Sequence, residues 1–145
     1  MKHLTIKSSD LCRRPRRGAT AVEFALVTPL FFLLLFTGME FSVLSTIRST
    51  ANNAAYEGAR KLVIPGADAA TGQTEAERIM SVVGVNNLTV TVTPATLTDT
   101  TEEVTVKVSV PYASNAIVVP WFAGNLVIES ESTLRTERYG GVGGS

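Results

Sequence analysis

The stretch that decides the fold is residues 19–62, which read ATAVEFALVTPLFFLLLFTGMEFSVLSTIRSTANNAAYEGARKL. Within it, Phe24 to Met39 is a run of 16 residues without a formal charge. Extended back to Ala19, the run would be about 31 Å long as a helix at ~1.5 Å per residue. The hydrocarbon core of a bilayer is about 30 Å thick. The sequence therefore predicts a membrane-spanning helix over about residues 19–40.

After Glu40 the apolar pattern changes its period but does not stop. Apolar side chains recur every three or four residues as far as Leu62, which is the spacing of one helical face. We therefore expect the helix to continue through an amphipathic half over residues 41–62, before Pro65 and Gly66 end it. Small residues dominate its apolar face: Ala51, Ala54, Ala55, Gly58 and Ala59. Small residues allow the helix to approach its partner closely. This partner could be the protein's own sheet or another subunit.

The formal net charge of zero over 145 residues is the sum of two unlike parts. Residues 1–18 hold six basic residues and one acidic residue, a net charge of +5, and the remainder carries −5. Because the basic residues directly precede the apolar run, the positive-inside rule places residues 1–18 in the cytoplasm. We therefore expect a single-pass protein of the inner membrane with an exported C-terminal part. A neutral chain also argues against nucleic-acid binding.

The amino-acid composition excludes several kinds of chemistry. The single Cys is Cys12 and the single His is His3, so the chain from Ala19 onward has neither a thiol nor an imidazole. Catalysis by Cys–His pairs or Ser–His–Asp triads and the usual zinc sites are thereby excluded from the main body. One cysteine also cannot form an intramolecular disulfide. We therefore expect that the protein is not an enzyme, has no catalytic residues, and binds no cofactor or metal.

One carboxylate, that of Glu23, falls inside the predicted membrane helix. A charged side chain at the bilayer centre costs ~2.5–3.5 kcal/mol on insertion scales. Glu23 is therefore expected at headgroup depth, protonated, or with a partner. Three alternatives exist for the start of the chain: a signal peptide cut near Val43–Ser45, an uncleaved anchor, or cleavage on the cytoplasmic side of the apolar run. Gly18 suits the third, because it lacks a Cβ and resists helix formation.

The residues around Gly18 have the layout of a prepilin: a basic leader, a small residue, and an apolar helix with Glu at its fifth position. GATAVEFALVTPLFFLLLFTGMEF at 18–41, followed by RSTANNAAYEGAR at 48–60, resembles the TadE-like family. Members of this family are minor pilins or pseudopilins of the tight-adherence (Flp) pilus system. The resemblance implies that a prepilin peptidase cuts between Gly18 and Ala19, and that the product acts with other pilin or pseudopilin subunits.

The cleavage implied by this resemblance gives Glu23 a role. Cleavage would expose a cationic amine on Ala19, and a carboxylate four residues later can neutralise an amine at an apolar interface. The amine could also belong to a neighbouring subunit in an assembly, so that Glu23 sets the register between subunits. The simpler alternative is a carboxylate that the helix dipole favours near a helix start, by ~0.3–1 kcal/mol.

The pattern beyond Leu62 predicts a small α+β domain over residues 63–138. Residues 68–74 are expected to form a loop, and the capping-box pattern at Thr74–Glu77 predicts a short helix that stops at Gly84. Alternating apolar residues then predict three strands, over residues 88–92, 104–110 and 126–134, with linkers that allow antiparallel pairing. The fold class is thus a long N-terminal helix packed on a small antiparallel sheet, as in pilins. Residues 139–145 are Gly-rich, which predicts a disordered tail.

Two local features of this domain could carry chemistry. Asp99, Glu102 and Glu103 could bind a hard cation, but their spacing matches no coordination loop, so a solvated turn is favoured. Trp121 and Phe122 could contact a partner or the membrane surface, and packing in the core is favoured for them. The resemblance to the TadE-like family implies that the protein is a structural minor pilin or pseudopilin. The alternative is an uncleaved, membrane-anchored binding or adhesin module.

Overall fold

The computed structural model describes residues 17–117 and 125–137. The basic leader up to residue 16, Trp121 and Phe122, and the Gly-rich tail lie outside the described residues. The chain divides into two compact units, one ending at Phe36 and the other beginning at Thr37. Helix α1 (Arg17–Val63) runs from the first unit into the second.

Helix α1 begins two residues before the expected start at Ala19, so Gly18 lies in its first turn. A glycine inside a helix costs only about 1 kcal/mol relative to alanine, and the favourable residues that follow outweigh this cost. The helix ends at Val63, next to the predicted end at Leu62. The chain then turns through Gly66, which has a positive φ of 83°.

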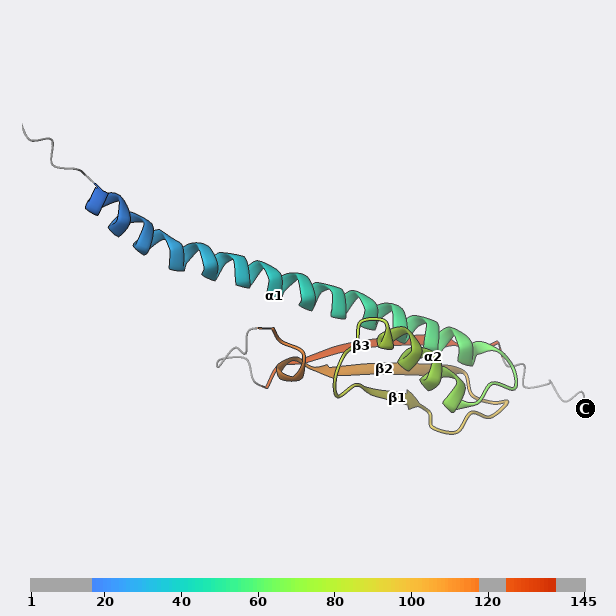
Figure 1. Cartoon of the computed structure of the whole chain (residues 1–145). Coiled ribbons are helices and arrows are strands. Elements are labelled where there is room, and N and C mark those ends of the chain that lie inside the picture. Colours follow the sequence, from blue (N-terminus) through green and yellow to red (C-terminus); the bar gives the residue numbers. More distant parts are fainter. Residues whose placement is uncertain (1–16, 118–124, 138–145) are drawn as a thin grey trace, which may run out of the picture. The chain divides into compact units, whose positions relative to one another are not determined.

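The sheet of the second unit has three strands: β1 (Thr89–Thr93), β2 (Glu103–Pro111) and β3 (Val127–Arg135). Their order is β1-β2-β3, and both neighbouring pairs are antiparallel. The three predicted strands and their antiparallel pairing are thus confirmed. The expected α+β class, a long N-terminal helix packed on a small antiparallel sheet, is confirmed as well (Figure 1).

The core of this unit lies between the sheet and the two helices that cover one of its faces (Figure 1). The central strand β2 supplies four valines with no exposed surface, at alternate positions: Val104, Val106, Val108 and Val110. Burying each such side chain contributes ~1.5–3 kcal/mol. The other face of the sheet is polar, with a hydroxyl contact between Thr105 and Thr133 (2.8 Å) and an ion pair between Lys107 and Glu129 (3.0 Å).

Helix α2 (Ala69–Ser81) corrects one prediction, because most of the expected loop 68–74 is helical. Thr74 lies inside α2 and does not cap it. The physical reason is a contact with α1: a Cβ on Gly72 would lie 2.6 Å from Cγ of Leu62, so glycine lets α2 approach α1 closely. The first turn of α2 is therefore stabilised by packing on α1, and the helix begins earlier than the capping pattern predicts. The helix ends at Ser81, three residues before the predicted stop at Gly84, and a turn leads from it to Gly84, which has a positive φ of 66°.

Candidate functional site

The residues expected at the processing site lie in the first two turns of α1. Gly18, Ala19 and Glu23 are all exposed. A Cβ placed on Gly18 would meet no atom within 4 Å. Among the described residues, Glu23 makes no ion pair. The chain itself therefore does not require glycine at position 18, and the Glu23 carboxylate is accessible to a group from outside the described residues.

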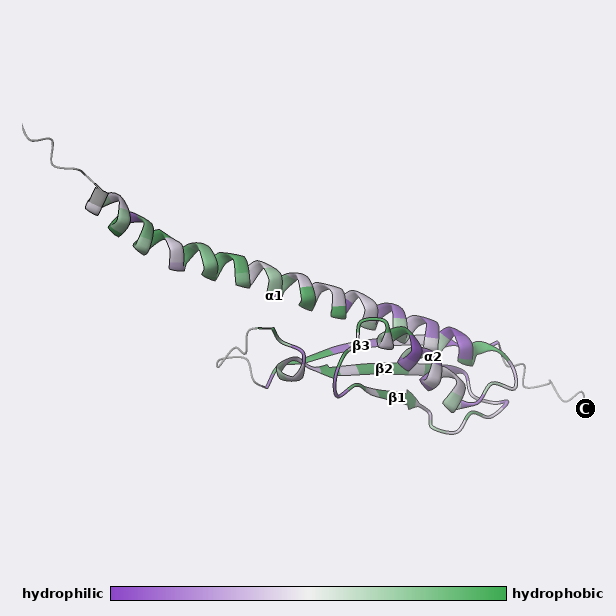
Figure 2. Cartoon of the chain, in the orientation of Figure 1, coloured by the Kyte–Doolittle hydropathy of each residue, from purple (hydrophilic) through white to green (hydrophobic). Residues whose placement is uncertain are grey.

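The apolar run that follows forms the mostly green section of α1 in Figure 2, and all of its side chains except the half-buried Thr28 are exposed. No residue of its most apolar 18-residue window is buried, and the helix is long and apolar enough to cross a membrane. The exposed fractions of Phe24 and Leu34, for example, are 73% and 70%. The hydroxyl of Thr28 donates to the carbonyl of Phe24 (2.7 Å), so this polar side chain is satisfied within the helix, as hydrocarbon surroundings require.

The small-residue face of α1 lies inside the second unit. Its five members are buried: Ala51, Ala54, Ala55, Gly58 and Ala59. The approach is closest at Gly58, where a Cβ would lie 2.9 Å from the carbonyl oxygen of Gly72 and 3.4 Å from Cγ1 of Val106. This face therefore packs on α2 and on the chain's own sheet.

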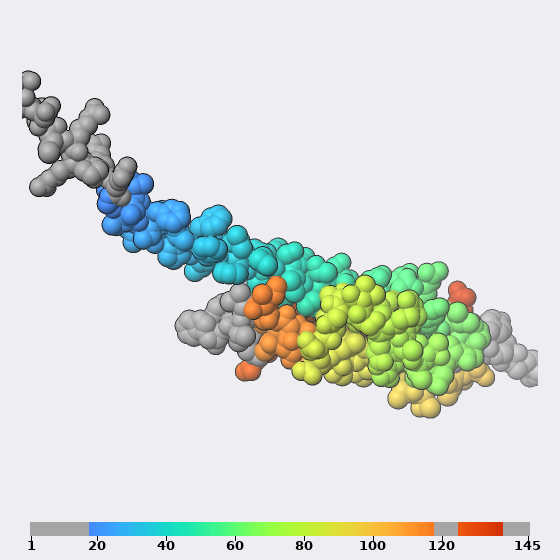
Figure 3. All heavy atoms as spheres, in the orientation of Figure 1, coloured from blue at the N-terminus to red at the C-terminus, as the bar shows by residue number. Residues whose placement is uncertain are grey.

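Polar contacts surround Glu40, a residue that in the sequence marks only the end of the charge-free run. Its Oε2 accepts a hydrogen bond from the backbone N–H of Ile117 (3.0 Å), 77 residues further along the chain. Its carboxylate also acts on the phenol of Tyr112, whose pKa it raises. Tyr112 belongs to a short 3₁₀ helix, η1 (Tyr112–Ser114), and its side chain is buried. Figure 3 shows the orange atoms of this segment against α1.

The one available signal for this contact was the position of Glu40. It is the first formal charge after 16 residues without one, and a carboxylate at such a boundary needs polar partners or water. The sequence does not reveal which partner it takes, because Tyr112 and Ile117 are distant in the chain.

The titration of Tyr112 offers a test of this contact. Burial, and then the interaction with the Glu40 carboxylate, raise the pKa of Tyr112 from its ordinary value to about 12. A raised pKa means that folding favours the neutral phenol. The contribution of the neutral Tyr112 phenol to the free energy of unfolding is therefore present in full below pH ~10 and is lost as the pH rises from ~10 to ~12.

We expect the free energy of unfolding to fall less steeply over this pH window in Tyr112→Phe than in the wild type. The measurement is denaturant unfolding at a series of alkaline pH values. Tyr56→Phe is the matched control, because Tyr56 is 47% exposed and its loss should leave the wild-type slope unchanged. Equal slopes for Tyr112→Phe and the wild type would contradict the assignment.

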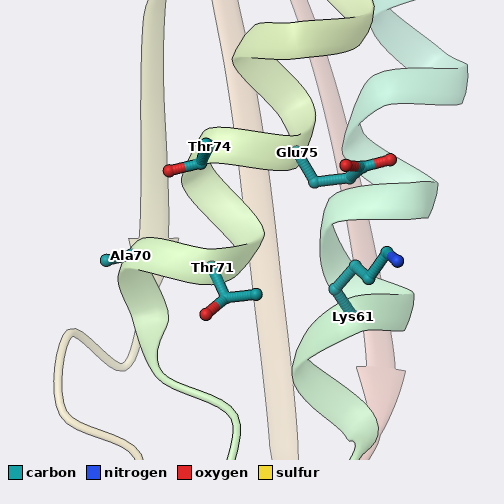
Figure 4. Close-up of a pocket in the computed structure, with 5 residues that line it drawn as sticks. All are labelled: Lys61, Ala70, Thr71, Thr74 and Glu75. Atoms are coloured by element: carbon teal, nitrogen blue, oxygen red, sulfur yellow. The ribbon is translucent and has the colours of Figure 1, made fainter.

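A shallow pocket of about 410 Å³ lies between α1 and α2. Lys61 of α1 and four residues of α2 line it, and Figure 4 shows the Thr74 hydroxyl turned away from Lys61. The hydrogen bond from the Arg78 guanidinium (2.7 Å) lowers the pKa of Glu75, and the positive charge of Lys61 acts in the same direction. The Glu75 carboxylate is thus already paired within α2.

The acidic residues Asp99, Glu102 and Glu103 do not form a metal-binding group in the structure. In the part of the chain that the structure describes, no three His, Cys, Asp or Glu residues are placed to hold a metal ion. Next to these acidic residues, the backbone N–H of Thr98 donates a hydrogen bond to the hydroxyl of Thr101 (2.9 Å), which closes a local turn.

Comparison with known proteins gives one match. Residues 18–60 match the model of the TadE-like protein family. This confirms the resemblance over the stretch that includes Gly18, Glu23 and the small-residue face. No curated protein matches the chain, and no solved structure matches it.

Proposed function

We propose that the protein is a structural minor pilin or pseudopilin that a prepilin peptidase cleaves between Gly18 and Ala19, and that it acts in assembly of the tight-adherence (Flp) pilus. The match to the TadE-like family over residues 18–60 suggests a role in tight-adherence pilus systems. The observation that carries the proposal is that the match begins at Gly18, in the first turn of an exposed apolar helix with Glu23 near its start.

The proposal assigns a role to each part of the chain. Residues 1–18 are a cytoplasmic leader, about 19–40 span the inner membrane, 41–62 carry the small-residue face, and 63–138 form the exported domain. The charge distribution favours this orientation, since six of the thirteen basic residues precede Ala19. The partners are the membrane, the peptidase, and other pilin or pseudopilin subunits of the same machinery.

Glu23 gains a physical role once the leader is removed. A carboxylate and an amine ~4 Å apart at an effective dielectric constant of ~20 attract by roughly 4 kcal/mol before desolvation is subtracted. Its exposure on α1 would let it pair with the Ala19 amine of its own chain or of a neighbour. In the second case it would set the register between subunits.

The mass of the mature protein tests the cleavage directly. We expect the membrane-inserted product to begin at Ala19, which intact-mass spectrometry or N-terminal sequencing would detect. An intact Met1 that is independent of prepilin peptidase would support the alternative, an uncleaved binding or adhesin module. A start near Thr46 would indicate an ordinary signal peptide. Either result would overturn the proposal.

Removal of the Glu23 charge should separate processing from assembly. We expect Glu23→Gln to be cleaved but recovered with the pilus machinery at a much lower level than the wild type, because the carboxylate pairs with an amine only after cleavage. The measurement is co-purification with pilus subunits from solubilised membranes. Glu57→Gln is the matched control on the same helix, since the Glu57 carboxylate forms a surface pair with Arg60 (3.7 Å). If Glu23→Gln were recovered at the wild-type level, Glu23 would have no role in assembly, and its carboxylate would only interact favourably with the helix dipole.

A further inference from the structure

Three exposed aliphatic residues, Ile117, Leu126 and Val127, belong to the segments that leave and enter the sheet at the end where β2 finishes. Their exposed fractions are 53%, 54% and 48%. Val127 pairs with Pro111 at the end of the β2–β3 ladder, and the carbonyl of Leu126 accepts a hydrogen bond from the N–H of Tyr112 (2.9 Å). We call these three residues the apolar end of the domain. Apolar side chains grouped on an exposed surface commonly mark a contact with another phase or partner.

The apolar end is held at the point where the charge-free run of α1 finishes. The Ile117 N–H donates to the Glu40 carboxylate (3.0 Å), whose charge also acts on the Tyr112 side chain. Glu40 and these partners all belong to the unit that begins at Thr37. Wherever Glu40 lies relative to a bilayer, Ile117 therefore lies at nearly the same depth.

Further hydrogen bonds hold this segment in place from the other side. The side chain of Asn115 accepts from the N–H of Asn86 (2.7 Å) and donates to the carbonyls of Asn86 (3.0 Å) and Pro111 (2.9 Å). Asn87 donates to the hydroxyl of Ser114 (2.9 Å). The segment from Pro111 to Ile117 is thus tied both to α1 and to the turn before β1.

We propose that the apolar end rests on the membrane, with Ile117, Leu126 and Val127 in contact with lipid at headgroup depth. The inference depends on the membrane anchor of the proposed function. Continuity with that anchor identifies the bilayer as the occupant: Met39 and Phe41, on either side of Glu40, are 47% and 72% exposed, so the lipid-facing surface of α1 reaches the residue that holds Ile117. A carboxylate with polar partners suits the interface, where water and headgroups begin.

Collisional quenching of a fluorophore on single cysteines would test this inference. In a full-length Cys12→Ser background, the variants Ile117→Cys and Leu126→Cys are labelled with NBD and reconstituted in vesicles of phosphatidylcholine and phosphatidylglycerol. Quenching is compared between aqueous iodide and a phosphatidylcholine with a nitroxide near its headgroup. Ile64→Cys is the matched control, because Ile64 is 59% exposed and follows the far end of α1. Leu33→Cys reports on the anchor itself.

We expect the labels at 117 and 126 to be quenched several-fold more by the nitroxide lipid, and several-fold less by iodide, than the label at 64. Iodide quenching at 117 and 126 equal to that at 64, with the label at 33 still in lipid, would overturn the inference and leave the anchor intact. Protection of 117 and 126 from both quenchers would place them against protein and would also overturn it. Iodide access at 33 would contradict the anchor, and with it the proposed function.

Discussion

Replacing Gly18 by Leu is expected to leave the protein as an uncleaved precursor in the membrane. A peptidase must place the 18–19 peptide bond in its active site, and misplacement by ~1 Å can cost about 100-fold in rate. The chain itself should tolerate the change, because a Cβ at Gly18 would meet nothing within 4 Å. The measurement is the ratio of precursor to product in isolated membranes, read by intact mass.

Gly38→Leu is the matched control for this substitution. Gly38 lies in the same helix, and a Cβ placed on it would also meet nothing within 4 Å. We expect wild-type cleavage of this variant. Equal loss of cleavage in both variants would assign the effect to helix propensity or insertion, and wild-type cleavage of Gly18→Leu would contradict the assigned cleavage site.

Replacing Gly72 by Ala is expected to destabilise the domain by about 1–3 kcal/mol, the usual cost of overpacking a core. The added Cβ would lie 2.6, 2.7 and 2.8 Å from Cγ, Cδ1 and Cδ2 of Leu62, whose side chain is fully buried. Alanine is favoured over glycine in a helix by up to about 1 kcal/mol, so the clash must outweigh this gain. For a domain of this size, a loss of 1 kcal/mol lowers Tm by ~4–8 °C.

Near-UV circular dichroism during heating would measure this loss, because it reports on the packed domain. Thr71→Ala, at an exposed neighbouring position of α2, should change Tm little. The double variant Leu62→Ala/Gly72→Ala should lose less than the sum of the single changes, because the smaller side chain makes room for the Cβ. Additive losses, or a higher Tm for Gly72→Ala, would show that the close approach of α1 and α2 is not needed for stability.

The candidate processing site can be predicted from the sequence because all of its signals are local. Gly18, Ala19 and Glu23 are close in the chain, and the apolar run that follows identifies itself by length and lack of charge. The contact of Glu40 with Tyr112 and Ile117 was not readable, because it joins residues more than 70 positions apart. No local period or spacing encodes such a pair.

The sequence alone determined the long helix, the three strands and their boundaries to within about two residues, because helix and strand periods of 3.6 and 2 are properties of neighbouring residues. Only the tertiary structure decided that α2 begins at Ala69, because the contact of Gly72 with Leu62 outweighs the capping pattern at Thr74. It also decided what the small-residue face of α1 contacts. A face of small residues specifies close approach but not its partner, and here the partners are the β2 valines and α2.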